Sequence, residues 1–292
     1  MKKLNHNFLV KSATYAAIGV ASILIITKLI AWRLTNSLSV QASLIDSLLD
    51  GAASLINCIL IHQALKPADA AHRFGHGKIE ALAGLAQSAF IAGSAIWLLV
   101  ETSHRFFNPA PLVASSIATM IMISATLLTA LLVMWQRYVI HHTKSIAIEA
   151  DSLHYYGDFL SDIAVLISLN LSVKFGWYRL DSMLATLIAS YILYTSWKIA
   201  IASLNILMDR EFPEKDRQHI QKIALQNPRV LKIDDLRTRS SGQKDFIQMH
   251  LELESDLPLA TAHQISEEVS KEIHKQFSRA EIIIHQKPYK KK

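Results

Sequence analysis

Long apolar segments separated by short polar connections fill the first two thirds of the chain. A helix needs roughly 20 mostly apolar residues to cross a bilayer. Isolated polar residues interrupt each apolar segment and small residues recur within them, a pattern that favours a closely packed bundle of helices. The pattern predicts six membrane-spanning helices, at Ala13–Trp32, Val40–Leu65, Ala81–Glu101, Leu112–Ile140, Ala147–Phe175 and Leu184–Leu204.

The pattern changes in the last third of the chain. Pro213–Gln226 and Pro258–Phe277 carry apolar residues at helical spacing, whereas Val230–Arg239 and Phe246–Glu254 alternate as strands do. Ala280–His285 reads as a closing strand. The order helix, strand, strand, helix, strand predicts a small α+β domain, with a three-stranded sheet covered on one face by two helices.

The distribution of charge supports a division into two domains. Residues 1–206 hold 24 charged side chains, whereas the much shorter segment 207–292 holds 30. The first segment is too poor in charge for a soluble fold of its size, and the second has an ordinary soluble composition. We therefore expect a transmembrane domain at 1–206 and a separate C-terminal domain at 207–292. A single soluble domain, a disordered chain and a fibrous protein are excluded.

The basic residues predict the orientation in the membrane. Cytoplasmic connections carry the excess of lysine and arginine. Eight basic residues fall in one set of connections and four in the other, which predicts that both termini and the C-terminal domain lie in the cytoplasm. The formal net charge of +6 is spread along the chain, so no nucleic-acid partner is expected. The eight are Lys2, Lys3, Lys11, Lys66, Arg73, Lys78, Arg137 and Lys144, and the four are Arg33, Arg105, Lys174 and Arg179.

Ionisable residues occur inside two of the predicted spans. Asp46 and Asp50 are four residues apart in the second span, and His154 and Asp158 have the same spacing in the fifth. Residues four apart share a helix face, and each charge costs about 2.5–3.5 kcal/mol at mid-bilayer. If the two helices face each other, three carboxylates and one imidazole form a site for a divalent metal. Zinc is the first choice, with iron, cadmium or manganese as alternatives. In the other interpretation, each pair hydrogen-bonds across the bundle or faces a water-filled crevice.

Two weaker patterns lie outside the spans. Asp69, His72 and His76 follow the second span and could bind a second metal, although a plain hydrophilic loop explains them nearly as well. Scattered histidines in the C-terminal domain are more often structural or exposed than ligands. One cysteine, Cys58, excludes a disulfide framework and any multi-cysteine metal cluster.

Taken together, these motifs resemble the cation diffusion facilitators, and in particular the bacterial ferrous-iron and zinc efflux pumps. The resemblance rests on Asp46-x-x-x-Asp50, His154-x-x-x-Asp158 and the loop Phe74-Gly-His-Gly-Lys78, and it extends over essentially the whole chain. It implies a homodimeric metal/proton antiporter of the inner membrane that exports zinc, iron or cadmium. The cytoplasmic domain would be similar to copper chaperones, and no organic cofactor is implied.

The resemblance also implies roles for individual residues. In this subgroup Lys78 would pair with Asp209 next to the dimer interface, as an interlock between subunits. The metal sites carry over to the positions that match. These are Asp46, Asp50, His154 and Asp158 for transport, Asp69, His72 and His76 for the loop site, and His250, His263 and His285 for part of a two-metal cytoplasmic site.

Two cytoplasmic positions depart from the pattern of the subgroup. Asp234 stands where the subgroup has a histidine, and it could still ligate a metal. Lys287 stands where an aspartate would bridge the two metals, so a bridging oxygen is replaced by a cation. We therefore expect this site to be weakened, to hold one metal, or to be empty.

Three other functions would each require a different feature of this protein. A membrane metallohydrolase would need a motif such as His-Glu-x-x-His, which is absent, so the chain is not expected to be an enzyme. A passive metal channel would conduct independently of a proton gradient. A membrane-tethered metal sensor would depend on the altered cytoplasmic site. In the antiporter, metal and protons compete for the same ligands, and His154 is the expected proton carrier.

Overall fold

The computed structural model describes residues 6–35, 38–107, 116–175 and 179–289. It divides into two compact units, Met1–Ser203 and Leu204–Lys292, each with a hydrophobic core of its own. The expected cytoplasmic residues Lys2 and Lys3 lie outside the described part of the chain. The two units are considered separately below.

Six helices of 27 to 30 residues make up the first unit. At 1.5 Å per residue, each is long enough to cross a hydrocarbon core of about 30 Å. Except for the fourth, the helices are longer than the predicted spans because they continue into polar sequence at their ends. The start of the predicted fourth span, residues 112–115, lies outside the described part of the chain. They are α1 (His6–Thr35), α2 (Leu38–Ala64), α3 (Lys78–Phe107), α4 (Ser116–Thr143), α5 (Ile146–Phe175) and α6 (Leu180–Leu207).

Five of these helices, all except α5, are apolar enough by length and composition to span a membrane. The exception carries Glu149, Asp151, Asp158 and Asp162. Its most extensive contacts are with four other helices, α1 to α4, so its polar side chains can meet protein instead of lipid. The predicted helical membrane domain is confirmed, and the polar helix is at its centre.

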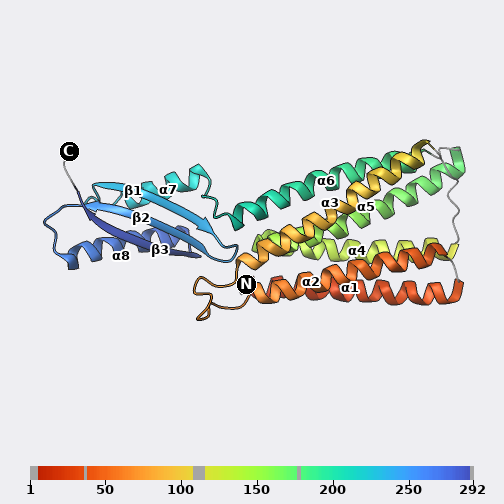
Figure 1. The fold of residues 1–292 in the computed structure, drawn as a ribbon, viewed down its shortest axis with the longest axis horizontal. Coiled ribbons are helices and arrows are strands. Elements are labelled where there is room, and N and C mark those ends of the chain that lie inside the picture. Colours follow the sequence, from red (N-terminus) through yellow and green to blue (C-terminus); the bar gives the residue numbers. More distant parts are fainter. Residues whose placement is uncertain (1–5, 36–37, 108–115, 176–178, 290–292) are drawn as a thin grey trace. The chain divides into compact units, whose positions relative to one another are not determined.

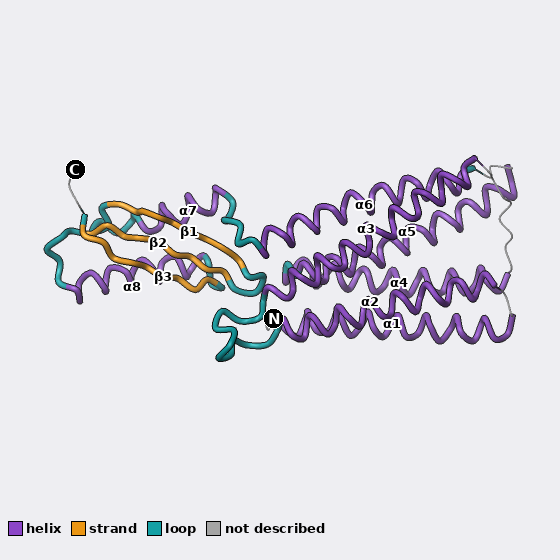
Figure 2. Tube along the Cα trace, in the orientation of Figure 1, coloured by secondary structure: helices purple, strands orange, loops and turns teal. Residues whose placement is uncertain are grey.

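Small residues allow close approach between the helices, which run side by side in Figures 1 and 2. A Cβ atom added at Gly157 of α5 would lie 2.7 Å from Cδ1 of Ile192 on α6. One added at Gly84 of α3 would lie 2.9 Å from Oγ of Ser203 on α6. Glycine therefore permits α6 to pack directly on α3 and α5.

The second unit is a three-stranded sheet with two helices. Strands β1 and β2 are antiparallel, and β2 and β3 are parallel, in the spatial order β1-β2-β3. The α+β domain expected from the sequence is thereby confirmed. Its elements are α7 (Glu214–Ala224), β1 (Lys232–Ser240), β2 (Asp245–Leu253), α8 (Leu259–Gln276) and β3 (Ala280–Pro288).

From Ile247 onward, buried and less buried residues alternate along β2 and separate the two faces of this sheet. Ile247, Met249 and Leu251 are buried in one cluster with Ile220 of α7 and Ile265 of α8. Both helices therefore cover the same face, as expected from the sequence. The intervening residues of β2, such as His250, lie on the open face.

Candidate metal centre

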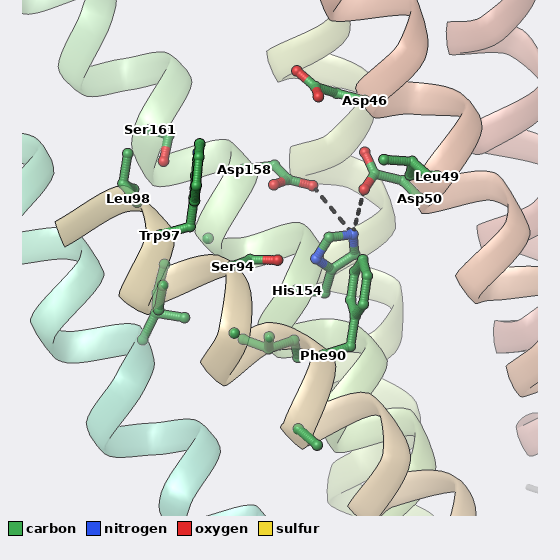
Figure 3. Close-up of a pocket in the computed structure, with 16 residues that line it drawn as sticks. Asp46, Leu49, Asp50, Phe90, Ser94, Trp97, Leu98, His154, Asp158 and Ser161 are labelled. Atoms are coloured by element: carbon green, nitrogen blue, oxygen red, sulfur yellow. Dashed lines mark hydrogen bonds and ion pairs between the residues drawn. The ribbon is translucent and has the colours of Figure 1, made fainter. Parts of the chain in front are cut away.

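Helices α2 and α5 bring a histidine and two aspartates together. Nε2 of His154 lies 2.9 Å from Oδ1 of Asp50 and 3.9 Å from Oδ2 of Asp158. One ligand atom from each residue lies within 4.8 Å of the other two. Figure 3 shows the imidazole between the two carboxylates, with a dashed line to each. The four-residue spacing thus places His154 and Asp158 on the same face of α5, as expected from helix geometry.

Asp46 is set apart from this group. It precedes Asp50 by one turn of α2, a separation of about 6 Å along the helix. In Figure 3 its carboxylate has no dashed line to the histidine, although it lines the same cavity. Of the four predicted transport ligands, the structure brings three into one cluster and leaves Asp46 at the edge.

The cluster faces a cavity of about 690 Å³. The cavity lies between α2, α3, α5 and α6, and its walls are largely apolar. The ring of Phe90 meets the His154 imidazole edge-on, with centroids 6.1 Å apart. A mostly apolar pocket with a few convergent polar groups is the usual form of a binding site for a small ligand. The lining includes Leu49, Phe90, Trp97, Leu98 and Ile192, and the polar residues Asp46, Asp50, Ser94, His154, Asp158 and Ser161.

The donor set suits a divalent transition metal. Zinc binds imidazole nitrogen and carboxylate oxygen at 2.0–2.2 Å, so neighbouring ligand atoms of a tetrahedral site are about 3.4 Å apart. The two distances from His154 Nε2, 2.9 and 3.9 Å, bracket that separation. A dication could therefore enter the cluster with small side-chain movements.

Several buried polar residues beside the cluster have no periodic signal in the sequence. Asp151 is 1% exposed and accepts a hydrogen bond of 2.7 Å from Nε2 of Gln136. The hydroxyls of Ser54 and Tyr155 are 2.7 Å apart. These contacts join α5 to α2 and α4 directly next to His154. They depend on which helices are neighbours, and the spacing along one helix does not specify that.

The loop residues also come together. Nδ1 of His72 is 3.3 Å from Oδ1 of Asp69, and Nε2 of His76 is 3.4 Å from Oδ2. Gly75, with φ +84°, supplies the left-handed turn that closes this segment. The backbone N–H groups of His72 and Ala71 donate to Asp69 Oδ1. The first of these bonds is the main reason that the pKa of Asp69 is lowered. An ionised carboxylate and two imidazoles are thus available in this solvent-accessible loop.

The cytoplasmic candidates are only partly assembled. Asp234, His250 and His285 lie opposite one another across the three strands, and the two imidazole rings are 5.1 Å apart. His263 is exposed on α8, the helix that covers the other face of the sheet. Nζ of Lys287 is 3.7 Å from Oδ2 of Asp234. Among the residues described in this unit, no three potential ligands cluster as they do in the membrane unit.

Asp235 is a cytoplasmic carboxylate that the sequence reasoning missed. Its Oδ2 lies 4.0 Å from Nε2 of His250, and Oδ1 accepts a 2.8 Å hydrogen bond from Arg237. That hydrogen bond is the main reason that the pKa of Asp235 is lowered. A shift in strand pairing between Asp234 and Arg237 places Asp235 here, with φ +47°. The sequence gives no signal for such a bulge.

The predicted interlock spans the two units. Lys78 begins α3, and Asp209 follows α6 in the second unit. Within that unit, Asp209 pairs with Arg239 at 3.3 Å. A pairing between Lys78 and Asp209 stays a prediction.

Comparison with known proteins gives matches in both units. Residues 14–208 match the cation efflux transmembrane domain, and residues 212–289 match the cytoplasmic domain of cation efflux proteins. Curated relatives described as "Cation-efflux pump FieF", from Shigella boydii serotype 18 (strain CDC 3083-94 / BS512) and Escherichia coli (strain K12 / DH10B), are 42% identical over 280 residues. These alignments cover 96% of this chain and 93% of each relative. A solved structure whose title names a zinc transporter, CzrB, in its Zn form is 26% identical and covers 29% of this chain and 99% of its own, with a TM-score of 0.27.

Proposed function

Because the chain belongs to the cation efflux family of membrane transporters, we propose that it exports divalent metal ions from the cytoplasm in exchange for protons. Zinc is the proposed main substrate, with ferrous iron and cadmium as further substrates. The protein works as a homodimer in the inner membrane, with both termini in the cytoplasm. The match of residues 212–289 to the family's cytoplasmic dimer domain supports the dimer.

One observation carries this proposal: the cluster of Asp50, His154 and Asp158 inside the helical unit. A dication that leaves water must find replacement ligands and negative charge, because an uncompensated ion is very unfavourable in a low-dielectric interior. Two carboxylates and one imidazole meet both needs. Asp46, one turn away on the same cavity, is the proposed fourth ligand.

The bond between His154 and Asp50 supports the proposed proton exchange. In the proposed metal-free state Asp50 is ionised and its oxygen accepts the hydrogen bond, so Nε2 of His154 carries the proton in their 2.9 Å contact. The same nitrogen is the atom that would ligate a metal. Metal and proton therefore exclude each other at this atom. Metal binding on the cytoplasmic side releases the proton, and protons from outside displace the metal and return the transporter to its inward-facing state.

The loop cluster is the proposed entry site. Asp69, His72 and His76 lie in the connection between α2 and α3, outside the membrane-spanning helices. Two of the three side chains are well exposed, with 61% of the His72 side chain and 53% of the Asp69 side chain accessible. These exposed ligands can capture a hydrated ion before it enters the cavity.

Flux measurements in proteoliposomes test the proposed function. Wild-type protein should accumulate zinc, ferrous iron and cadmium when a proton gradient of the right direction is imposed. Asp50→Ala should reduce zinc flux at least a hundredfold, because the cluster loses a ligand and its hydrogen-bond partner for His154. Glu101→Gln is the matched control, since Glu101 pairs with Arg105 at the end of α3 and lies outside the cavity. Full activity of Asp50→Ala would refute the assignment.

A further inference from the structure

Lys28 is a basic residue in the last third of a membrane-spanning helix. It lies inside the apolar segment His6–Arg33 of α1, five residues before the segment ends, where a charged side chain is costly unless polar partners surround it. Its Nζ donates to Oγ of Ser47 at 2.7 Å and to the backbone oxygen of Ser43 at 3.2 Å. Both partners belong to α2, on either side of Asp46 in sequence. The ammonium is therefore anchored at the level of the metal centre.

Lys28 lines a second cavity, which is distinct from the one described above. This cavity has a volume of about 190 Å³ and lies between α1, α2, α4 and α5. Among the residues that line it, Lys28 is the only lysine or arginine, and four carboxylates accompany it. Asp46, Asp50 and Asp158 line both cavities, so these three residues form part of the wall between them. The fourth carboxylate is Asp162.

Asp162 belongs to this second cavity and not to the metal cluster. Its Oδ2 accepts a 2.9 Å hydrogen bond from the hydroxyl of Thr126 on α4. It follows Asp158 by one turn of α5 and does not line the large cavity. Lys28 shares one cavity with Asp162 and with Asp46 and Asp158. One fixed cation thus faces carboxylates of the metal centre and one carboxylate beyond it.

We propose that Lys28 is a tethered cation that determines the affinity of the metal centre for dications. This inference rests on the proposed function, because it concerns the same site. Without metal, the ammonium balances part of the carboxylate charge. With metal bound, it repels the dication across the wall that the two cavities share. The ammonium cannot diffuse away, because Ser43 and Ser47 hold it in place.

A transporter needs such a limit on affinity. Three or four carboxylates in a low-dielectric cavity would hold a dication so tightly that release would become slow. Passage through a site requires binding that is favourable enough for entry and weak enough for exit. The repulsion is proportional to the charge of the ion, so the ammonium repels a dication more strongly than a monovalent ion. For the same reason it opposes the binding of a second dication beside the first.

Zinc binding to the full-length protein in detergent tests the inference. Lys28→Met, which keeps the length of the side chain, should lower the Kd for zinc about tenfold. In proteoliposomes the same variant should show a lower KM and a lower kcat, because release becomes limiting. Lys28→Arg keeps the charge and should bind zinc within about twofold of wild type.

Asp162 provides the compensating variant. Asp162→Asn alone should raise the Kd about threefold, because the metal centre loses a nearby negative charge. The double variant Lys28→Met/Asp162→Asn should recover part of the change, with a Kd about threefold below that of wild type. If Lys28 only fastened α1 to α2, the double variant would instead bind as poorly as a misfolded protein and unfold at a lower temperature.

The outcomes separate this inference from the proposed function. A wild-type protein that neither binds nor moves zinc would refute the proposed function. If the wild type transports zinc and a folded Lys28→Met variant has an unchanged or higher Kd for zinc, only the role of Lys28 is refuted. If Lys28→Met does not fold, the Asp162→Asn variant takes its place in the test. An unchanged Kd for zinc in Asp162→Asn would then refute the proposed effect of charges in the second cavity, and with it the role of Lys28.

Discussion

At the scale of single residues, the identity of one ligand should influence which metal is carried. His154 supplies the nitrogen of a cluster whose other donors are carboxylate oxygens. Imidazole suits zinc and iron, whereas carboxylate and water suit manganese and magnesium. The choice of a histidine at this position therefore biases the site toward zinc.

Replacing that nitrogen should change the preference. In His154→Asp, zinc flux should fall at least tenfold relative to manganese flux, because an all-oxygen site loses its advantage for zinc. Competition between the two ions in proteoliposomes measures the ratio directly. His104, exposed near the end of α3, offers the control variant His104→Asp, which should leave the ratio unchanged. An unchanged ratio in His154→Asp would show that His154 is not a ligand.

Lys287 should limit the number of metal ions that the cytoplasmic domain binds. Its ammonium is 3.7 Å from the carboxylate of Asp234, next to the row formed with His250 and His285. In Lys287→Asp a cation is replaced by an oxygen donor, so the variant should bind at least one more zinc ion per chain than wild type. Lys287→Ala breaks the ion pair without adding a donor and should gain none. Equilibrium dialysis of the full-length protein counts the ions. Two tightly bound ions in the wild-type cytoplasmic domain would contradict this account.

At the scale of elements, the packing of α6 on α5 supports the metal centre. Gly157 lines the large cavity and lies next to Asp158. A Cβ at this position would be 2.7 Å from Cδ1 of Ile192, too close for ordinary contact. Overpacking of this kind typically costs about 1–3 kcal/mol.

A pair of substitutions tests this contact. Gly157→Ala should lower the unfolding temperature and reduce zinc flux several-fold, because the end of the Ile192 side chain must move to make room for the new methyl group at the edge of the cavity. Ile192→Val removes the Cδ1 atom, so Gly157→Ala/Ile192→Val should recover most of both losses. Normal flux and stability of the single Gly157→Ala variant would mean that the space between α5 and α6 accommodates the added methyl group.

The helices themselves could be predicted from the sequence, because a bilayer demands long apolar segments and the chain supplies them. The pairing of His154 with Asp158 also follows from spacing alone. The contacts of Lys28 with α2 and of Gln136 with Asp151 could not be predicted in this way, since each depends on which helix lies opposite. Asp46 shows that a correct prediction of the helix face does not guarantee a contact. Its spacing from Asp50 predicts a shared helix face, but the facing histidine reaches only one of the two.

In the cytoplasmic domain, regular alternation predicted the strands and the buried face of β2. The position of Asp235 depends on an irregular pairing between β1 and β2, which alternation does not reveal. His263 is grouped with His250 and His285 only through the family resemblance. The structure of one chain leaves it on the helix side of the sheet.

At the scale of the whole molecule, the account predicts a fixed exchange of metal for protons. In the proposed mechanism, Nε2 of His154 holds either a proton, in its bond to Asp50, or a metal ion. Coupled to alternating access, this exclusion would move protons against the direction of the metal in every cycle. A channel lined by the same residues would have no such requirement.

The most direct test is to record the pH inside proteoliposomes while zinc is added outside. Zinc entry should be accompanied by alkalinisation of the lumen at the same rate, as protons leave in exchange. An imposed inside-acid gradient should accelerate zinc uptake, and a proton ionophore should abolish that acceleration. Zinc uptake of undiminished rate with no change in luminal pH would contradict the account.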